Sequence, residues 1–314
     1  MLMVKMRSIH RGVMTAVLLL VVVLTACSNG TEAGGEGKMK VTATTGMIAD
    51  IAREVGGSYV EVTGLMGPGV DPHLYKASQG DIRKLEEADV ILYNGLHLEG
   101  KMSEILEKMS AGKKVAAVAE SIPPKELRSG EEMNTEYDPH VWFNVKHWMV
   151  VVEAVRDTLT EADPDHAEQY KEQTAAYLAE LEKLDNEVRE KIAEIPEPSR
   201  VLVTAHDAFG YFGQAYGMKV MGLQGISTAA EYGAKDVSEL RDYLVENNIK
   251  AVFVESSVPA KAMEAIIAGA AEKGHTVNIG GELFSDAMGA EGTEEGTYIG
   301  MIRHNADTIS EALK

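Results

Sequence analysis

The chain has 314 residues, and its 30 Lys and Arg against 49 Asp and Glu give a formal charge of −19 at pH 7. Because one hydrophobic core rarely grows beyond ~250–300 residues, this length predicts two lobes. The apolar fraction of 45% and the charged fraction of 25% exclude global disorder, and the acidic balance argues against nucleic-acid binding, which needs clustered Lys and Arg.

Residues 1–26 have the pattern of a signal peptide. Three basic residues precede an apolar run at 13–24, which is too short for a membrane-spanning helix of ~20 residues. The run ends in Leu24-Thr25-Ala26-Cys27, which resembles the bacterial lipobox, in which the cysteine is lipidated and becomes the first mature residue. A plain membrane anchor with a buried cysteine is the alternative. We favour lipidation because a polar, glycine-rich stretch follows Cys27 directly.

Cys27 is also the only cysteine of the chain, which excludes an intramolecular disulfide and every zinc or iron–sulfur site with two or more thiolates. Residues 27–38 are predicted to form a flexible tether, because Ser28–Lys38 has too little apolar surface to bury. Eleven extended residues span at most ~36 Å, so we expect the folded part to stay close to the membrane.

Beyond the tether, short β-branched runs alternate with helical patterns. In the first half, strands are expected at 41–44, 59–65, 90–93 and 114–118, and helices at 47–55, 78–88, 98–109 and 144–160. In the second half, strands are expected at 201–204, 220–223, 251–255 and 276–279, and helices at 209–216, 234–247, 259–273 and 298–313. This alternation predicts an α/β fold with two similar lobes, each with a parallel sheet flanked by helices.

A long helix is predicted between the two halves. Asp163-Pro164-Asp165 is a typical start signal, and apolar residues then recur at helical spacing from Tyr170 to Ile195, before Pro196. A helix over 165–195 is about 46 Å long and can bridge both lobes. We therefore expect an N-terminal lobe at 39–162, a bridging helix at 163–197 and a C-terminal lobe at 198–314.

Three of the nine histidines stand where a ligand site is expected. His73 and His140 each complete an Asp-Pro-His sequence, in which proline stiffens the loop that presents the imidazole. The aspartate can accept a hydrogen bond from the other imidazole nitrogen, the usual support of a metal-bound histidine. His206 ends a buried-looking strand, at the edge where open α/β sheets bind ligands. His97 follows a strand end, and we expect it to support a ligand from outside the site or to lie at the surface. A structural or solvated role is expected for His10, His147, His166, His275 and His304.

Asp286 is the fourth candidate, because it follows the last predicted strand. Two of the four candidates lie in each half, so lobes whose strand ends face each other would bring all four into one cleft. Three neutral imidazoles and one carboxylate form a compact ligand set for a divalent transition metal. The sequence therefore predicts a metal site formed by His73, His140, His206 and Asp286.

The same residues carry a resemblance to a known family, the metal-binding solute-binding lipoproteins of bacterial ABC transporters (the TroA-like class, cluster A-I). The matching segments are Asp71-Pro72-His73-Leu74-Tyr75, Asn94-Gly95-Leu96, Asp138-Pro139-His140-Val141-Trp142, residues 204–212 and Asp286-Ala287-Met288-Gly289. The resemblance implies zinc, manganese or iron as cargo, a membrane permease as partner and the same four ligands. Asp71 is implied as a further oxygen ligand or as a support for one. We expect a monomer.

Two departures bear on the metal. Residues 121–137 contain no histidine, whereas zinc-specific relatives often have a His-rich loop there, and His206 stands where several manganese-specific relatives have glutamate. The chain is therefore similar to the three-histidine members, which carry manganese or zinc. Nitrogen-rich sites bind Zn²⁺ more tightly than Mn²⁺ whatever their biological role, so both cargoes stay open. A single helical bridge resists wide opening, so we expect release by local loop movement.

A zinc-dependent hydrolase and a surface adhesin, or a binder of another solute such as chelated iron, are the alternatives. Catalytic zinc usually keeps one open position, and four protein ligands leave little room for it. The chain also lacks H-E-x-x-H, G-x-S-x-G and P-loop motifs. An adhesin is expected to expose an aromatic patch, and 6% aromatic residues give no sign of one. We therefore predict an extracytoplasmic, lipid-anchored binding protein for metal-ion transport that is not an enzyme.

Overall fold

The structure, a computed structural model, describes residues 37–130 and 136–314. Within it, Lys38–Lys314 form one compact unit. The predicted signal peptide, Cys27 and most of the predicted tether lie outside the described residues. In the described part of the chain, no helix combines the length and the apolar character that a membrane span requires.

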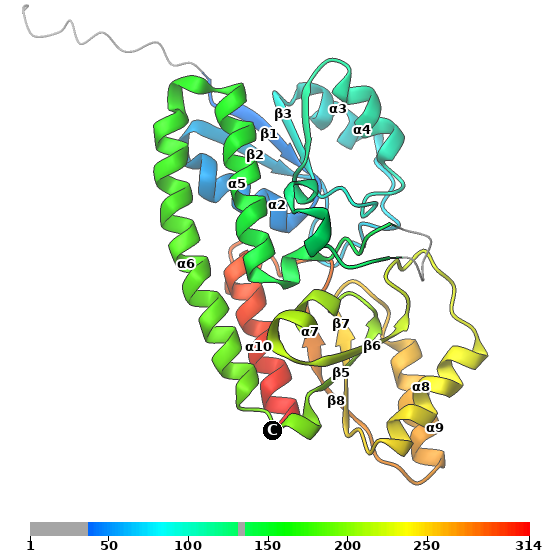
Figure 1. The fold of residues 1–314 in the computed structure, drawn as a ribbon. Coiled ribbons are helices and arrows are strands. Elements are labelled where there is room, and N and C mark those ends of the chain that lie inside the picture. The colour runs from blue at the N-terminus through cyan, green and yellow to red at the C-terminus, as the bar shows by residue number, and fades with distance from the viewer. Residues whose placement is uncertain (1–36, 131–135) are drawn as a thin grey trace, which may run out of the picture. The chain divides into compact units, whose positions relative to one another are not determined.

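A four-stranded parallel sheet organises the first half of the compact unit (Figure 1). Its strands, in the spatial order β2-β1-β3-β4, are β1 (Met39–Ala43), β2 (Val60–Gly64), β3 (Val90–Tyr93) and β4 (Lys114–Ala117). The accompanying helices are α2 (Gly46–Gly56), α3 (Gln79–Glu87), α4 (Ser103–Ser110) and α5 (Val145–Ala162). The central strands β1 and β3 bury consecutive residues, as expected for parallel strands covered on both faces.

Two parallel strand pairs organise the second half. The first pair is β5 (Val201–His206) with β6 (Lys219–Gln224), and the second is β7 (Ala251–Glu255) with β8 (Asn278–Leu283). Strand β7 also packs beside β5. The helices are α7 (Gly210–Tyr216), α8 (Ala234–Glu246), α9 (Lys261–Glu272) and α10 (Tyr298–Leu313). Parallel strands flanked by helices in both halves confirm the predicted α/β class.

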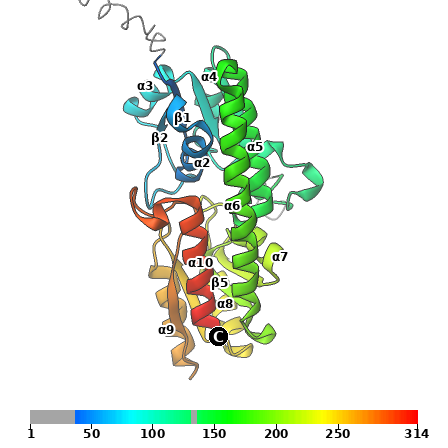
Figure 2. The ribbon, with the colours of Figure 1, turned by 90° about the vertical axis from the view of Figure 1, so that its left-hand side faces the viewer.

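Helix α6 (Ala167–Ala193) is the predicted long helix, and it runs alongside both halves (Figure 2). It packs against α2 and α5 of the first half and against α7 and α10 of the second. Its buried stripe is Tyr170, Thr174, Tyr177, Leu181, Leu184, Asp185, Val188 and Ile192. The α-helix is 27 residues long rather than the predicted 31, partly because Pro164–His166 form a 3-10 turn.

Two other elements differ from the prediction by four or more residues at one end. The helix expected from residue 98 begins only at Ser103, because Gly95, Leu96 and His97 all have positive φ and the buried Glu99 carboxylate accepts backbone N–H groups from Asn94 and Gly95. The strand expected at 276–279 is β8, which extends to Leu283 through Gly280 and Gly281. Consecutive glycines lower the expected strand propensity, so they hid the second part of this strand.

Candidate metal centre

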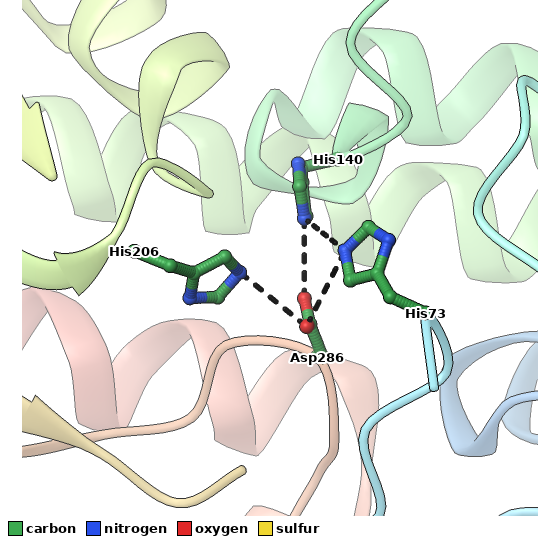
Figure 3. Close-up of side chains that lie close together, drawn as sticks. All are labelled: His73, His140, His206 and Asp286. Carbon is green, nitrogen blue, oxygen red and sulfur yellow. Dashed lines mark hydrogen bonds and ion pairs between the residues drawn. The ribbon is translucent and has the colours of Figure 1, made fainter. Parts of the chain in front are cut away.

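The side chains of His73, His140, His206 and Asp286 converge on one point (Figure 3). His140 Nε2 lies 3.3 Å from both His73 Nε2 and Asp286 Oδ1. Asp286 Oδ2 lies 3.4 Å from His206 Nε2 and 3.7 Å from His73 Nε2. One potential ligand atom from each residue lies within 4.8 Å of those of the other three.

The four side chains come from strand ends and loops. His73 lies in the loop after β2, and His140 directly precedes the 3-10 turn Val141–Phe143. His206 is the last residue of β5, and Asp286 follows β8. Because parallel strands end at the same edge, the fold gathers residues from both halves at one place. The structure thus brings together all four residues that the sequence singled out.

The spacing and burial of the four residues suit a small cation. Ligands that surround a metal tetrahedrally at 2.0–2.1 Å are about 3.3 Å apart, which matches the shorter distances here. His73 is 4% exposed, Asp286 2%, and the other two are fully buried. The Asp286 oxygens face imidazole nitrogens and accept no hydrogen bond from any other described residue. A buried carboxylate in such surroundings needs a positive partner.

His140 is fixed by a buried aspartate from its own Asp-Pro-His sequence, as predicted. Asp138 Oδ1 lies 2.8 Å from His140 Nδ1 and accepts the backbone N–H of the same residue at 3.0 Å. The Arg128 guanidinium forms an ion pair with Asp138 at 3.3 Å. The Tyr211 hydroxyl donates to the Asp138 backbone carbonyl at 3.0 Å. These contacts hold Nε2 as the imidazole nitrogen that faces the cluster.

His206 is fixed by Glu255, a residue that the sequence reasoning missed. Glu255 Oε2 lies 2.5 Å from His206 Nδ1, and Oε1 accepts the backbone N–H of His206 at 2.8 Å. Both residues are buried and end neighbouring strands, β5 and β7. One signal could have identified Glu255. It is an acidic residue at the end of the apolar strand Ala251–Glu255, and ligands bind at the carboxyl ends of such strands.

The same prediction, of an aspartate that contacts the imidazole, is wrong for His73, whose aspartate contacts the backbone instead of the ring. Asp71 Oδ1 accepts the backbone N–H of His73 at 2.9 Å rather than a ring N–H, and Oδ2 accepts the Thr228 hydroxyl at 2.6 Å. Asp71 is therefore not a member of the converging group but links the His73 loop to the second half of the chain. His97 is exposed, with a φ of 66°, and also lies outside the group.

The protonation preferences of the three imidazoles follow from these supports. Burial lowers the pKa of His73 to about 3, so its imidazole is neutral. Burial also acts to lower the pKa of His140, but the Asp138 and Asp286 carboxylates outweigh it and raise that pKa to about 9. Glu255 and Asp286 likewise outweigh burial at His206 and raise its pKa well above the usual value. The imidazoles in turn outweigh burial at Asp286 and hold its pKa well below the usual range.

Comparison with known proteins agrees with this geometry. The chain is 55% identical over 308 residues to the manganese-binding lipoprotein MntA of Bacillus subtilis, which covers 97% of this chain and 100% of the relative. It is 51% identical over 282 residues to the zinc-binding protein TroA of Treponema pallidum, covering 90% of this chain and 91% of that protein. It is 31% identical over 309 residues to the manganese ABC transporter substrate-binding lipoprotein PsaA of Streptococcus mitis, covering 96% and 98%.

A solved structure and a family model extend the comparison. The periplasmic zinc-binding protein TroA of Treponema pallidum superimposes with a TM-score of 0.86 at 51% identity, over 88% of this chain and 99% of that one. Residues 41–312 match the family model of ZnuA, the periplasmic component A of the zinc-uptake complex. The match covers both halves and all four converging residues, and the chain therefore belongs to the ZnuA family of metal-binding proteins of ABC transporters.

Proposed function

We propose that this protein captures one divalent transition-metal ion, Mn²⁺ or Zn²⁺, and delivers it to an ABC permease. The observation that carries the proposal is the convergence of His73, His140, His206 and Asp286 at distances that fit a small cation. These residues supply three imidazole nitrogens and one carboxylate, a donor set for divalent transition metals. The metal is cargo, and the four residues are its ligands.

The burial of the site favours transport over catalysis. A catalytic zinc ion usually has three protein ligands and an open position for water or substrate. Here four side chains, each at most 4% exposed, face the same point, so a bound ion would have little contact with solvent. We propose a binding protein rather than a zinc hydrolase, as the names of its relatives also indicate.

The donor set is compatible with either cargo. The relative from Bacillus subtilis is named for manganese and the one from Treponema pallidum for zinc, at similar identity to this chain. Because divalent-metal affinity follows a fixed order, the purified site should bind Zn²⁺ more tightly than Mn²⁺ in either case. The donor types alone therefore do not decide the cargo, which also depends on the ion that the cell supplies and on the permease.

We propose that the protein acts as a monomer held at the outer face of the cell membrane. In this arrangement residues 1–26 are removed, the lipid on Cys27 is the anchor, and residues 27–38 tether the lobes at 39–162 and 198–314. Several relatives are named lipoproteins, which supports this placement. Cys27→Ala should abolish palmitate labelling and release the protein from the membrane fraction. The anchor would be contradicted if Cys27→Ala stayed in the membrane fraction and the parent protein took up no palmitate.

Cargo and role can be tested together in the native host. Elemental analysis of the purified protein should find about one manganese or zinc ion per chain, and deletion of the gene should slow growth when that metal is scarce. The parent gene should restore growth, whereas a variant carrying Asp286→Asn should not, although it is made in equal amount. Metal-free protein from cells, or full rescue by Asp286→Asn, would contradict the proposal.

A further inference from the structure

A buried tryptophan connects the two halves of the chain directly beside the metal site. Trp142 lies two residues after His140, in the 3-10 turn Val141–Phe143, and is fully buried. Its indole Nε1–H donates to the backbone carbonyl of Ser285 at 3.0 Å. Ser285 is the residue before Asp286, so one hydrogen bond joins the segments that carry two of the proposed ligands, although they are 143 residues apart in sequence.

The same residue is held from its other side by helix α10. The Tyr298 hydroxyl donates to the Trp142 backbone carbonyl at 2.8 Å, and the Tyr298 backbone N–H donates to Asp50 of α2 at 2.9 Å. The Trp142 ring also packs edge-on against the His140 imidazole, with 5.2 Å between ring centroids. Trp142 therefore has little freedom to move unless the residues around His140 move with it.

The other two histidines are not tied to Asp286 in this way. Glu255, which supports His206, belongs to the same half of the chain as His206. The His73 loop reaches the second half through Asp71 and the side chain of Thr228. The hydrogen bond from Trp142 to Ser285 is thus the contact best placed to set the 3.3 Å separation between His140 Nε2 and Asp286 Oδ1.

We propose, building on the metal-binding function above, that Trp142 is a positioning residue that makes the site select for small, four-coordinate ions. By fixing Asp286 close to His140, the indole N–H keeps the ligands at the spacing of a tetrahedral Zn²⁺ site. Mn²⁺ prefers more ligands, more of them oxygen. A looser Asp286 loop would accommodate such an ion more easily, at the expense of Zn²⁺ affinity.

The chain offers a matched control for this role. Trp148 of α5 is also fully buried, but its Nε1 has no hydrogen-bond partner among the described residues. The Trp148 ring stacks on that of Tyr298, with 5.1 Å between ring centroids, and a phenyl ring at this position retains a stacking partner. Trp142→Phe and Trp148→Phe therefore both delete an indole N–H from a buried position, and only the first deletion removes the bond to Ser285. Melting temperatures of the two metal-free variants report any general loss of stability.

The test compares parent and variants by competition with a chelator for Zn²⁺ and Mn²⁺, and by the visible absorption of bound Co²⁺. Loss of a residue that orients a ligand typically weakens metal affinity ~10–100-fold, so Trp142→Phe should weaken Zn²⁺ binding at least ~10-fold and Mn²⁺ binding less. Its Co²⁺ absorption should be weaker than that of the parent, as coordination rises above four. Trp148→Phe should match the parent in both measurements.

Several results would overturn the role of Trp142. These are a folded Trp142→Phe variant with parental affinities and Co²⁺ spectrum, a uniform loss of affinity with an unchanged spectrum, or equal changes in Trp148→Phe. Should Trp142→Phe fail to fold, Tyr298→Phe tests the same bridge. It is expected to show a smaller effect in the same direction, and a parental result contradicts the proposal. A parent that binds no metal would instead contradict the proposed function.

Discussion

The three histidines of the site fall into two classes, and the contrast suggests how the site handles its ion. His140 and His206 are fully buried, and each ring contacts a buried carboxylate, Asp138 or Glu255. His73 stands on a loop, and its aspartate holds the backbone instead of the ring. The first two are therefore held in place, but protons compete with the metal for their imidazole nitrogens. The third is neutral and less constrained. We infer that the His73 loop moves when the ion is released.

The largest effect should come from removing the group that all three imidazoles face. Asp286→Asn preserves size but removes the charge, so we expect stoichiometric binding to be lost. Metal at a thousandfold excess over its Kd should raise the free energy of unfolding of the parent by ~4 kcal/mol and leave the variant nearly unchanged. Calorimetry with and without Zn²⁺ measures this. Asp157→Asn, at an exposed aspartate, is the control and should respond like the parent.

The next effect separates the two classes of histidine. Glu255→Gln and Asp138→Asn should each weaken metal affinity ~10–100-fold, because each removes the carboxylate that fixes an imidazole. Asp71→Asn should have a smaller effect, since Asp71 contacts the backbone of His73 rather than its ring. Chelator competition provides the affinities. If Asp71→Asn weakened binding more than either of the other two, the distinction between the classes would be wrong.

The two classes of histidine also predict how many protons are released when the metal binds. With no metal bound, His140 and His206 carry protons at pH 7, because their pKa values are raised, whereas His73 is neutral. Binding should therefore release about two protons, and affinity should increase as the pH rises through the His140 pKa of about 9. Calorimetric titration in two buffers of different ionisation enthalpy gives the count. Binding without proton release would contradict these assignments.

The raised pKa of His140 also makes the stability of the metal-free protein depend on pH. The His140 pKa is 6.5 in the unfolded chain and about 9 in the folded one, so folding favours the protonated form. Its contribution to stability is complete below pH 6.5 and is lost as the pH rises through about 9. Asp138→Asn should reduce this dependence, which denaturant unfolding between pH 6 and 10 can measure. An unchanged dependence would remove Asp138 as the cause.

The smallest effect should come from the bond that ties the His73 loop to the second half. Thr228→Val deletes the hydroxyl that donates to Asp71, which typically contributes ~1 kcal/mol, equivalent to a roughly fivefold change in rate. We expect faster metal dissociation, measured by stopped-flow mixing with a chelator. Thr228→Ser retains the hydroxyl and should dissociate at the parental rate. Equal rates in all three proteins would show that this bond does not restrain release.

The four converging residues were predictable from sequence because each has a local signal. Two follow Asp-Pro, one ends an apolar strand, and Asp286 follows the last strand. Asp138 was predictable for the same reason, since it lies two residues before His140 in the same Asp-Pro-His sequence. Glu255 and Trp142 were not identified, because their roles depend on contacts with His206 and Ser285, which are far away in sequence.

The fold shows the same division between local and distant causes. Strongly apolar strands such as Val90–Tyr93 and Ala251–Glu255 were predicted at their observed bounds. The helix after β3 was predicted to start too early, because the left-handed turn at Gly95–His97 depends on the inward-facing Glu99 carboxylate. Hydrophobic periodicity reports which residues are buried, but not where a buried polar side chain interrupts the pattern.

X-ray absorption of the Zn²⁺-loaded protein tests most directly the claim that four distant side chains bind one ion. We predict about one Zn²⁺ per chain, surrounded by three imidazole nitrogens and one carboxylate oxygen at 2.0–2.1 Å, with one imidazole fewer in His206→Ala. A spectrum without imidazole scattering, or one that His206→Ala leaves unchanged, would contradict the account.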